Sequence, residues 1–475
     1  MKIGFLSLGC PKNLVDGEVM LGIARDAGHE IITEASGADV LVVNTCAFID
    51  SAKQESVDAI LEMAALKRDG KCSRLVVTGC LAERYRHDLQ KEIPEIDAVL
   101  GTGEVPEILT ALGDGRPALR SPEAAVPLRF FSKSALAATT PSAERPAPSA
   151  ERPAPDYLYD ATTPRLLTTP KHFAYVKVAE GCDYTCAFCI IPTLRGAYRS
   201  RTADSIVREA RSLAERGVRE LLLISQDTTF YGIDRGERGG LARLLRELNA
   251  VDGLEWIRLL YLYPTTITDD VLAAMAECEK VCRYIDLPLQ HASASVLKRM
   301  RRPGNRATYH RLLARIRERV PGVTLRTTLI VGFPGETDED FSELSAFVGD
   351  VEFDHVGVFT YSHEEGTRAF ALPDNVPASL KRKRRAALMS QQKRIVKRAQ
   401  RRRIGTEVRV MVDGASPEHE LAIQGRLEGH APEIDPVVYL TDCDPAEIRG
   451  GNLINARIVG ATDYDLIARP VASFQ

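Results

Sequence analysis

The stretch Glu180-Gly-Cys-Asp-Tyr-Thr-Cys-Ala-Phe-Cys-Ile-Ile-Pro192 contains three cysteines, Cys182, Cys186 and Cys189, in the spacing C-x3-C-x2-C. A four-iron iron–sulfur cube is normally held by four cysteine thiolates. Three closely spaced thiolates therefore leave one iron of such a cube open. This stretch predicts a cluster that binds a small molecule at its open iron.

Zinc and a disulfide are weaker alternatives to this cluster. Structural zinc is usually closed by four ligands, but His172 lies ten residues upstream of the triplet and the next histidine downstream is His291. The apolar run of residues 3–8 is too short for the core of a signal peptide, and no stretch reaches the roughly 18 apolar residues of a membrane span. Ten cysteines in 475 residues without a targeting signal thus indicate metal or catalytic use in a reducing cytoplasm, with no membrane partner.

Residues 1–112 are predicted to form a parallel α/β domain, because strands alternate with helices along them. The predicted strands are residues 2–8, 39–44 and 74–78, short runs rich in Val, Ile and Leu. Asp50 is a candidate cap for a helix that continues to Leu66 and closes at Gly70.

Each of these strands runs directly into a cysteine, namely Cys10, Cys46 and Cys80. In open parallel sheets the carboxyl ends of the strands form the ligand crevice, so the three thiols are expected to converge there. One cysteine after a strand is most often a small buried hydrophobe, but three in equivalent positions predict a second cluster site. The remaining cysteines are predicted to be structural: Cys72, Cys278, Cys282 and Cys443.

Residues 113–170 are predicted to be an extended and poorly ordered linker. Ten of the 26 prolines fall in this segment, and the sequence Pro-Ser-Ala-Glu-Arg-Pro-Ala occurs twice in tandem, at residues 141–147 and 148–154. Low-complexity segments of this composition cannot bury enough apolar surface to fold. No chemistry is assigned to the repeat.

Residues 171–380 are predicted to form a partial barrel of six parallel strands, a (β/α)6 arrangement. The predicted strands are residues 173–178, 220–224, 256–262, 284–289, 325–331 and 356–361. Successive strands start about 40 residues apart, which is the size of βα units, and six strands leave open a barrel that eight would close. The cysteine triplet follows the first strand and so belongs to the carboxyl-terminal face, where barrel active sites lie.

Polar residues from later strands are predicted to reach the same face. Any one of them is as compatible with a loop anchor as with a ligand contact, but together they predict a pocket for the cofactor and the substrate. These residues are Gln226, Asp227, Gln290, His291 and Arg326. No catalytic residue is predicted beyond the cluster ligands.

The two C-terminal segments differ in charge. Residues 381–403 carry twelve Lys or Arg and no acidic residue, and they predict a basic helix with Leu388, Ile395 and Ala399 on its packed face. A solvated face over a packed stripe is favoured over a nucleic-acid role. Residues 404–475 carry five Arg, no Lys and twelve Asp or Glu, and predict a small antiparallel β-barrel. Its predicted strands are residues 407–412, 422–426, 436–440, 453–459 and 464–468.

The arrangement resembles the methylthiotransferases, a family of radical S-adenosylmethionine (SAM) enzymes, over nearly the whole chain except the proline-rich linker. The family combines a three-cysteine N-terminal domain, a radical SAM domain and a C-terminal TRAM barrel, which is OB-like. Three segments are similar to the branch that modifies an aspartate of the twelfth small-subunit ribosomal protein: Gly9-Cys-Pro-Lys-Asn-Leu-Val-Asp16, Tyr261-Leu-Tyr-Pro264 and Arg299-Met-Arg-Arg-Pro-Gly304. The tRNA-modifying branch typically has Met in place of Lys12 and His in place of Tyr263. Gly17 departs from the pattern, since Ser is common there.

The resemblance implies two 4Fe-4S clusters with different functions. The cluster on the Cys182 triplet would bind SAM and generate the radical that removes a hydrogen from the β-carbon of the substrate aspartate. The cluster on the three N-terminal cysteines would hold the sulfur for transfer to that carbon. Two SAM molecules are then needed, one as methyl donor and one as radical source. The implied partners are a basic ribosomal protein, free or on the ribosome, together with an electron donor and a sulfur source that the sequence does not identify.

Two other functions stay open as alternatives: the same reaction on tRNA, at the adenosine beside the anticodon, and a non-catalytic electron carrier. Electron carriers normally saturate their clusters with protein ligands, which two three-ligand sites do not. RNA binding depends on Lys and Arg, whereas residues 404–475 have a net charge of −7, from five positive and twelve negative side chains. This charge favours a basic protein as partner, while the basic segment before it keeps RNA contact open.

Overall fold

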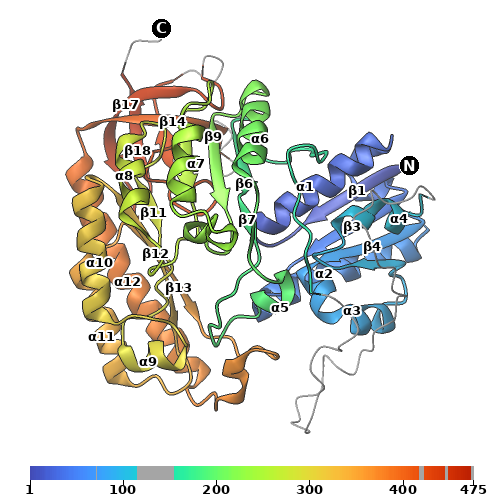
Figure 1. Ribbon diagram of the computed structural model, residues 1–475, viewed down its shortest axis with the longest axis horizontal. Helices are drawn as coiled ribbons and strands as arrows, with labels where there is room; N and C mark the ends of the chain where they lie inside the picture. Colours follow the sequence, from blue (N-terminus) through green and yellow to red (C-terminus); the bar gives the residue numbers. More distant parts are fainter. Residues whose placement is uncertain (71, 115–153, 417–421, 444–447, 472–475) are drawn as a thin grey trace.

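A five-stranded parallel sheet lies beside a six-stranded partial barrel, and a small closed barrel packs against the partial barrel (Figure 1). The computed structural model describes residues 1–70, 72–114, 154–416, 422–443 and 448–471. In Figure 1 the N-terminal domain, in blue, is on the right and the partial barrel, green to orange, is on the left. The short helix α5 (Ile191–Arg195) lies between them.

The N-terminal sheet is entirely parallel, in the order β2-β1-β3-β4-β5. Its strands are β1 Lys2–Ser7, β2 Glu30–Ile32, β3 Val40–Thr45, β4 Arg74–Gly79 and β5 Ala98–Leu100. The three predicted strands are confirmed, and the two edge strands β2 and β5 are too short for the sequence to predict. All six residues of β3 are buried, because a central parallel strand is covered on both faces.

Four helices complete the N-terminal domain: α1 Pro11–Asp26, α2 Asp50–Arg68, α3 Cys80–Glu92 and α4 Ile108–Leu112. The predicted cap of α2 is wrong, since Ile49 is the N-cap and Asp50 is the first helical residue. The Asp50 carboxylate instead lies 2.7 Å from Nζ of Lys53 and accepts a hydrogen bond from Ser362 (2.9 Å). It acts near the positive end of the helix as an ion-pair partner.

The end of the predicted linker is packed. Residues 115–153, which include nearly all of the tandem repeat, lie outside the described residues. Residues 154–170 have no helix or strand, but Arg165 within them is buried. Its guanidinium pairs with Glu18 of α1 (2.6 Å) and with Glu209 of the barrel domain (2.7 Å). The prediction of a loose linker is therefore wrong for this part, because a buried charge is costly to separate from its partners.

Six parallel strands form the partial barrel, in the order β6-β9-β10 and β11-β12-β13. An isolated bridge between Ile257 and Val281 and a hydrogen bond from the Leu262 N–H to the carbonyl of Asp286 (2.9 Å) join the two halves. The strands confirm the prediction, with shorter carboxyl ends in β10 and β11: β6 Phe173–Lys177, β9 Glu220–Ile224, β10 Trp256–Leu259, β11 Tyr284–Asp286, β12 Thr324–Val331 and β13 His355–Thr360. A small ribbon of β7 (Ala179–Glu180) and β8 (Arg199–Ser200) flanks the cysteine triplet.

Helices cover the outside of the partial barrel. They are α6 Ala203–Glu215, α7 Gly240–Asn249, α8 Asp269–Glu277, α9 Ala294–Arg299, α10 Arg306–Arg319, α11 Asp338–Val351 and α12 Ala378–Arg403. Capping boxes at Asn305 and Thr337 begin α10 and α11, which satisfies N–H groups that the first helical turn leaves without partners.

The basic helix α12 packs against α11 and β13. Leu388 and Ile395 are buried as predicted, but Ala399 is exposed and Gln400 takes the buried position beside it. The helical period explains the difference, since positions four and five residues after Ile395 lie on either side of the packed stripe. None of the helices in the described residues is long and apolar enough to cross a membrane.

The C-terminal strands form a closed barrel in the order β14-β15-β16-β18-β17. They are β14 Glu407–Ala415, β15 Ile423–Arg426, β16 Val438–Leu440, β17 Leu453–Ala461 and β18 Leu466–Pro470. The pairings are antiparallel as predicted, except that β16 pairs with β18 in parallel. This exception arises because the chain passes through β17 before β18 returns beside β16.

Buried ion pairs hold the small barrel against the amino-terminal end of the partial barrel. Glu220, the first residue of β9, pairs with Arg258 of β10 (2.7 Å) and with Arg426 of β15 (2.6 Å). Arg426 also pairs with Asp413 (2.9 Å), which contacts His172 (2.8 Å) just before β6. The small barrel thus occupies this end, and the carboxyl-terminal end of the partial barrel is left for the N-terminal domain.

Candidate active site

The three N-terminal cysteines lie where central strands of the parallel sheet end. Cys10 is the N-cap of α1, Cys46 follows β3 and Cys80 begins α3 directly after β4. Gly9 has a φ of 91°, and a Cβ built on it would lie 2.7 Å from Cβ of Cys46, so only glycine allows this close approach. Cys10 interacts electrostatically with both Cys46 and Cys80. The three cysteines thus follow neighbouring strands at one edge of the sheet, and their role as ligands of one cluster stays a prediction.

The thiols of this site are desolvated. Burial raises the pKa of Cys80 to about 12, although the nearby Arg195 guanidinium acts against the rise. Burial, with the neighbouring Cys10, also raises the pKa of Cys46. Thiols of this kind stay protonated at neutral pH until a metal displaces the proton. Buried thiols that repel one another when ionised fit a positively charged iron–sulfur core.

The Cys182 triplet lies in the loop between β7 and α5. The Cys182 N–H donates to the carbonyl of Gly196 (3.1 Å), and the Cys189 N–H donates to the carbonyl of Cys186 (3.2 Å). Burial raises the pKa of Cys189 to about 12 and that of Cys182 to about 11. Arg302 lies 3.5 Å from Sγ of Cys186, so a cation is available to offset the negative charge of a thiolate-bound cluster.

Both cysteine groups fit a cluster better than a single ion. Among the described residues, no three His, Cys, Asp or Glu side chains form a group that could hold one metal ion. Iron–sulfur cubes bind their cysteines at separate irons, so the ligands of a cube stand wider apart than those of one ion. The assignment of the six cysteines as cluster ligands stays a prediction.

Four buried charges join the two cysteine sites. Asp16 of α1 pairs with Lys177 of β6 (2.5 Å) and with Arg195 of α5 (2.5 Å), and Glu180 of β7 pairs with the same two cations at 2.5 and 3.3 Å. Burial alone would raise the pKa of Glu180, but Lys177 and Arg195 hold it below the ordinary value. We call these four residues the Asp16 network. Its two positive and two negative charges balance.

Arg195 belongs to both cysteine sites. It ends α5, the helix that starts two residues after Cys189, and its Nη2 lies 3.5 Å from Sγ of Cys80. The backbone around it is anchored as well, because Thr102 of the N-terminal domain donates a hydrogen bond to the carbonyl of Leu194 (2.5 Å). The segment that carries one triad therefore forms part of the wall of the other.

Replacing Arg195 with methionine is expected to lower the free energy of unfolding by about 3–5 kcal/mol, because Asp16 and Glu180 each lose a partner while remaining buried. Chemical denaturation of the purified variant measures this loss. The control is Arg208→Met, which removes the exposed pair of Arg208 with Asp204 (2.9 Å) and should cost less than about 1 kcal/mol. Equal losses in the two variants would contradict the structural role of the Asp16 network.

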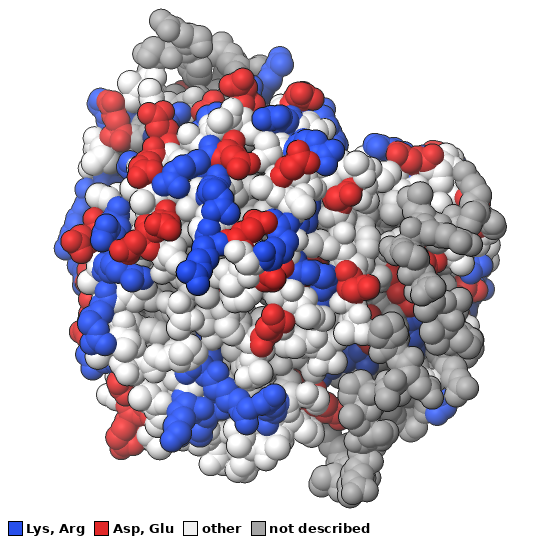
Figure 2. All heavy atoms as spheres, in the orientation of Figure 1, with Lys and Arg blue, Asp and Glu red and all other residues white. Residues whose placement is uncertain are grey.

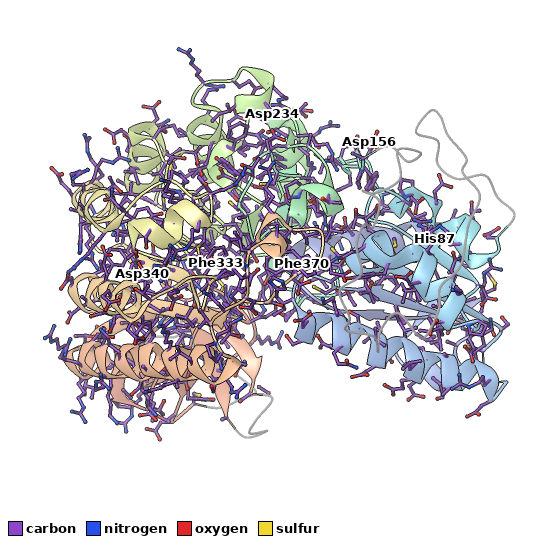
Figure 3. All side chains as sticks on the ribbon, turned by 90° about the horizontal axis from the view of Figure 1, so that it is seen from below. His87, Asp156, Asp234, Phe333, Asp340 and Phe370 are labelled. Atoms are coloured by element: carbon purple, nitrogen blue, oxygen red, sulfur yellow. The ribbon has the colours of Figure 1, made fainter. Side chains whose placement is uncertain are left out.

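Apolar side chains pack against the cysteine loop. Phe333 is fully buried in a cluster with Ala187 of the loop and with Ala369, and the Ala369 N–H donates to the carbonyl of Ala187 (2.7 Å). Figure 3 shows Phe370 between Phe333 and the N-terminal domain. Phe370 is 43% exposed, so it leaves an apolar surface beside the loop at the boundary of the two domains.

Two of the predicted pocket residues lie beside the cysteine loop. Gln226, which follows β9, donates a hydrogen bond to Glu180. Asp227 is buried and accepts hydrogen bonds from Tyr184 of the loop (2.8 Å) and from Thr266 (3.1 Å), and burial raises the pKa of its carboxyl group. These two residues position the loop. Contact with a cofactor stays a prediction.

The other three predicted pocket residues lie in different surroundings. Gln290 has a φ of 72° and pairs through its backbone with β12. His291 is fully buried and accepts a hydrogen bond at Nδ1 from the Ser293 N–H (3.0 Å), and burial lowers its pKa to about 3, so the ring is neutral. It lies in the core rather than in an open pocket.

The expected place of Arg326 at the carboxyl-terminal face is wrong. It is the third residue of β12, and its guanidinium pairs with Asp286 (2.9 Å) and with Asp435 of the small barrel (3.3 Å). The guanidinium therefore lies inside the partial barrel between Asp286 of β11 and Asp435 of the small barrel. Alternation along a strand shows which face a residue takes, but its depth in the barrel depends on where the strand begins.

Sequence reasoning did not assign roles to Lys12, Tyr261 and Tyr263. Nζ of Lys12 lies 2.9 Å from the centroid of the Tyr261 ring, and Tyr263 stacks on Tyr184 of the cysteine loop with 3.9 Å between centroids. Burial lowers the pKa of Lys12 to about 8. In the sequence these residues belong to two separate short motifs, at residues 9–16 and 261–264. Only the fold brings the two motifs into contact.

Comparison with known proteins divides the chain in the same way as the structure. Residues 2–101 match the uncharacterized protein family UPF0004, residues 176–348 match the radical SAM superfamily and residues 404–471 match the TRAM domain. The first range contains the N-terminal cysteines and the second contains the Cys182 triplet. Each cysteine site is thus carried by its own matched domain.

Full-length relatives carry the name ribosomal protein uS12 methylthiotransferase RimO. The protein from Koribacter versatilis is 49% identical over 98% of this chain and 96% of its own length. Those from Solibacter usitatus and Geobacter sulfurreducens are 46% and 45% identical over 99% of this chain, and over 95% and 99% of their own lengths. The chain belongs to the RimO family.

Solved structures outside the RimO family share the fold. The radical SAM methyltransferase TsrM from Kitasatospora setae, with cobalamin and a [4Fe-4S] cluster bound, matches 76% of this chain and 72% of its own with a TM-score of 0.53. The same enzyme with tryptophan and a SAM analogue bound gives 0.51. Sequence identity is 17% in both cases, so this likeness concerns architecture. The RimO family assignment rests on the full-length relatives.

Proposed function

We propose that this protein is a radical SAM methylthiotransferase that adds a methylthio group to the β-carbon of an aspartate in ribosomal protein uS12. The observation that carries the proposal is identity of 45–49% along nearly the whole chain with proteins named for that reaction. The geometry supports it, because two separate three-cysteine sites meet across one interface. A reaction that combines radical formation with sulfur transfer needs two such sites close together.

The cofactors are two 4Fe-4S clusters and SAM. The Cys182 triplet would hold the cluster that binds SAM, and Cys10, Cys46 and Cys80 would hold the other. When bound, these groups supply the electron that cleaves SAM and the sulfur that is transferred. The residues of this chain supply position and charge: α5 joins the two sites, and the Asp16 network keeps their separation fixed.

The interface also limits access of water to the sites. Glu364, which follows β13, pairs with Lys53 (2.8 Å) and Arg84 (2.8 Å) of the N-terminal domain. Its side chain is only 3% exposed, and Arg165 makes a second buried connection between the two domains through Glu18 and Glu209. A reactive carbon radical is protected from side reactions where closure excludes solvent.

The acidic excess of the small barrel does not support a basic partner as strongly as the sequence suggests. Asp413 is used in the buried pairs with the partial barrel, and Glu433 and Asp435 accept hydrogen bonds from Tyr175 (2.9 Å) and Tyr284 (2.6 Å). On the face shown in Figure 2, acidic and basic side chains are interspersed over the upper part. The case for a protein substrate therefore rests on the relatives rather than on charge.

The alternatives are less well supported. The tRNA reaction is not the one for which these full-length relatives are named, and an electron carrier would not need an open site at each cluster. We propose a cytoplasmic location, which a ribosomal protein as substrate supports. The electron donor and the sulfur source are further partners that the reaction requires, and substrate on the ribosome is as compatible with the structure as free substrate.

The test is modification of uS12 by the reconstituted enzyme. The enzyme, loaded with iron and sulfide under anaerobic conditions, is incubated with SAM, a reductant and either uS12 or unmodified tRNA. Mass spectrometry should show a methylthio group on one aspartate of uS12 and no change in tRNA nucleosides. Modification of tRNA with uS12 unchanged would overturn the proposal in favour of the tRNA branch.

A further inference from the structure

Lys12 is a cation beside the cysteine sites that has no anion partner. The groups that attract Lys12 electrostatically are Cys10, Glu180 and Asp286. Cys10 is a predicted cluster ligand, Glu180 is already paired with Lys177 and Arg195, and Asp286 is paired with Arg326 (2.9 Å). Among the described residues, Lys12 makes neither a hydrogen bond nor an ion pair, and its one close contact is the ring of Tyr261. No side-chain anion in the described part of the chain therefore neutralises the positive charge of Lys12 at the junction of the two domains.

Arg302 is a further cation beside a cysteine site that has no carboxylate partner among the described residues, but its contacts are already made. Arg302 directs Nη1 at Sγ of Cys186 (3.5 Å), and its Nη2 donates to the carbonyl of Pro288 (2.7 Å). These contacts fix the guanidinium at the Cys182 triplet. Lys12 has no comparable contact at its own site.

Lys12 stands at the junction of the two domains. It lies in the first turn of α1, two residues after Cys10, and Tyr261 lies two residues beyond the end of β10, at the mouth of the partial barrel. Tyr261 has a φ of 61°, a conformation that a bulky residue adopts only at a cost and that is found most often at functional sites. Its N–H donates to Asp286 (3.0 Å), which holds the turn in place.

A buried charge without a partner is expensive. The face of an aromatic ring attracts an ammonium group without neutralising it, so Tyr261 holds Lys12 in position and leaves its charge available. Lys12 is 8% exposed, which leaves a path for one further contact. These features indicate that an anion completes the site when the enzyme is at work.

We propose that the Lys12 ammonium binds the side-chain carboxylate of the aspartate that is modified. This inference rests on the proposed function. In aspartate the β-carbon is bonded directly to the carboxylate carbon, so a carboxylate held at Lys12 places the β-carbon beside Cys10 and at the mouth of the partial barrel. Lys12 is thus a substrate-binding residue that selects an acidic side chain.

The test compares two peptides that span the modified segment of uS12, one with the aspartate and one with asparagine in its place. Hydrogen bonds to charged groups are the stronger ones, and the wild-type enzyme should prefer the aspartate peptide about 10- to 100-fold in kcat/KM. Lys12→Met should lower kcat/KM for the aspartate peptide by a similar factor, mainly through KM, and leave the asparagine peptide nearly unchanged. Lys12→Arg should restore part of the preference.

Iron and sulfide content and thermal unfolding show whether the Lys12 variants are intact, and Lys91→Met, at an exposed position of α3, is the matched control. If Lys12→Met lost activity on both peptides equally, or lost iron, Lys12 would serve the cluster or the fold and the proposed role would be wrong. If the wild type modified neither peptide nor intact uS12, the proposed function would fail, and the role of Lys12 with it.

Discussion

Replacing Cys182, Cys186 and Cys189 together with alanine is expected to abolish SAM cleavage and methylthio transfer, and to remove about half of the bound iron. The three side chains are the only cysteines of the loop that carries them, so their removal leaves no thiolate there to hold a cluster, while Cys10, Cys46 and Cys80 are untouched. Reconstitution with excess iron and sulfide, followed by iron analysis and by assay of 5'-deoxyadenosine after chemical reduction, measures both effects.

The control for this variant is Cys278→Ala. Cys278 is 7% exposed and follows α8, away from the loop, so the change should cost a little stability and leave iron and SAM cleavage intact. Loss of all iron from the triple variant, in a protein that still unfolds cooperatively, would contradict two independent sites.

Replacing Cys10, Cys46 and Cys80 with alanine is expected to have the complementary effect. SAM should still be cleaved to 5'-deoxyadenosine, because the Cys182 triplet is intact, but no sulfur should reach uS12 and about half of the iron should be lost. Mass spectrometry of the substrate and iron analysis of the enzyme give the two readouts.

Cys72→Ala is the matched control within the same domain, since Cys72 is also 7% exposed but precedes its strand rather than following it. It should retain methylthio transfer. Transfer by the N-terminal triple variant at the wild-type rate would show that these cysteines do not carry the sulfur.

Much of the fold follows from local patterns in the sequence. The six strands of the partial barrel were predictable because short apolar runs recur at the spacing of βα units, and the N-terminal cysteines could be grouped because each follows a strand of one parallel sheet. Cys72, Cys278 and Cys282 are buried, as structural cysteines are, and their structural role stays a prediction. Cys443 is half-buried, and its thiol donates to the carbonyl of Leu440 (3.8 Å).

The interface between the domains could not be predicted in the same way. Asp16 and Arg195 are 179 residues apart in the sequence, and each alone has the appearance of an ordinary surface charge. The position of Arg326 was predicted wrongly because its partner Asp435 belongs to the small barrel. The local sequence of β12 does not indicate that the small barrel packs there. Lys12 and Tyr261 fall in this class too, since neither has a role until the two domains meet.

The double position of Arg195 has a consequence for how the protein acquires its clusters. Filling the Cys182 site would order the loop that leads into α5, and so hold Arg195 against Cys80. Filling the N-terminal site would hold the same helix from the other side. Linkage requires any such effect to be reciprocal, so whatever the Cys182 cluster does to the affinity of the N-terminal site, the N-terminal cluster does to the affinity of the Cys182 site.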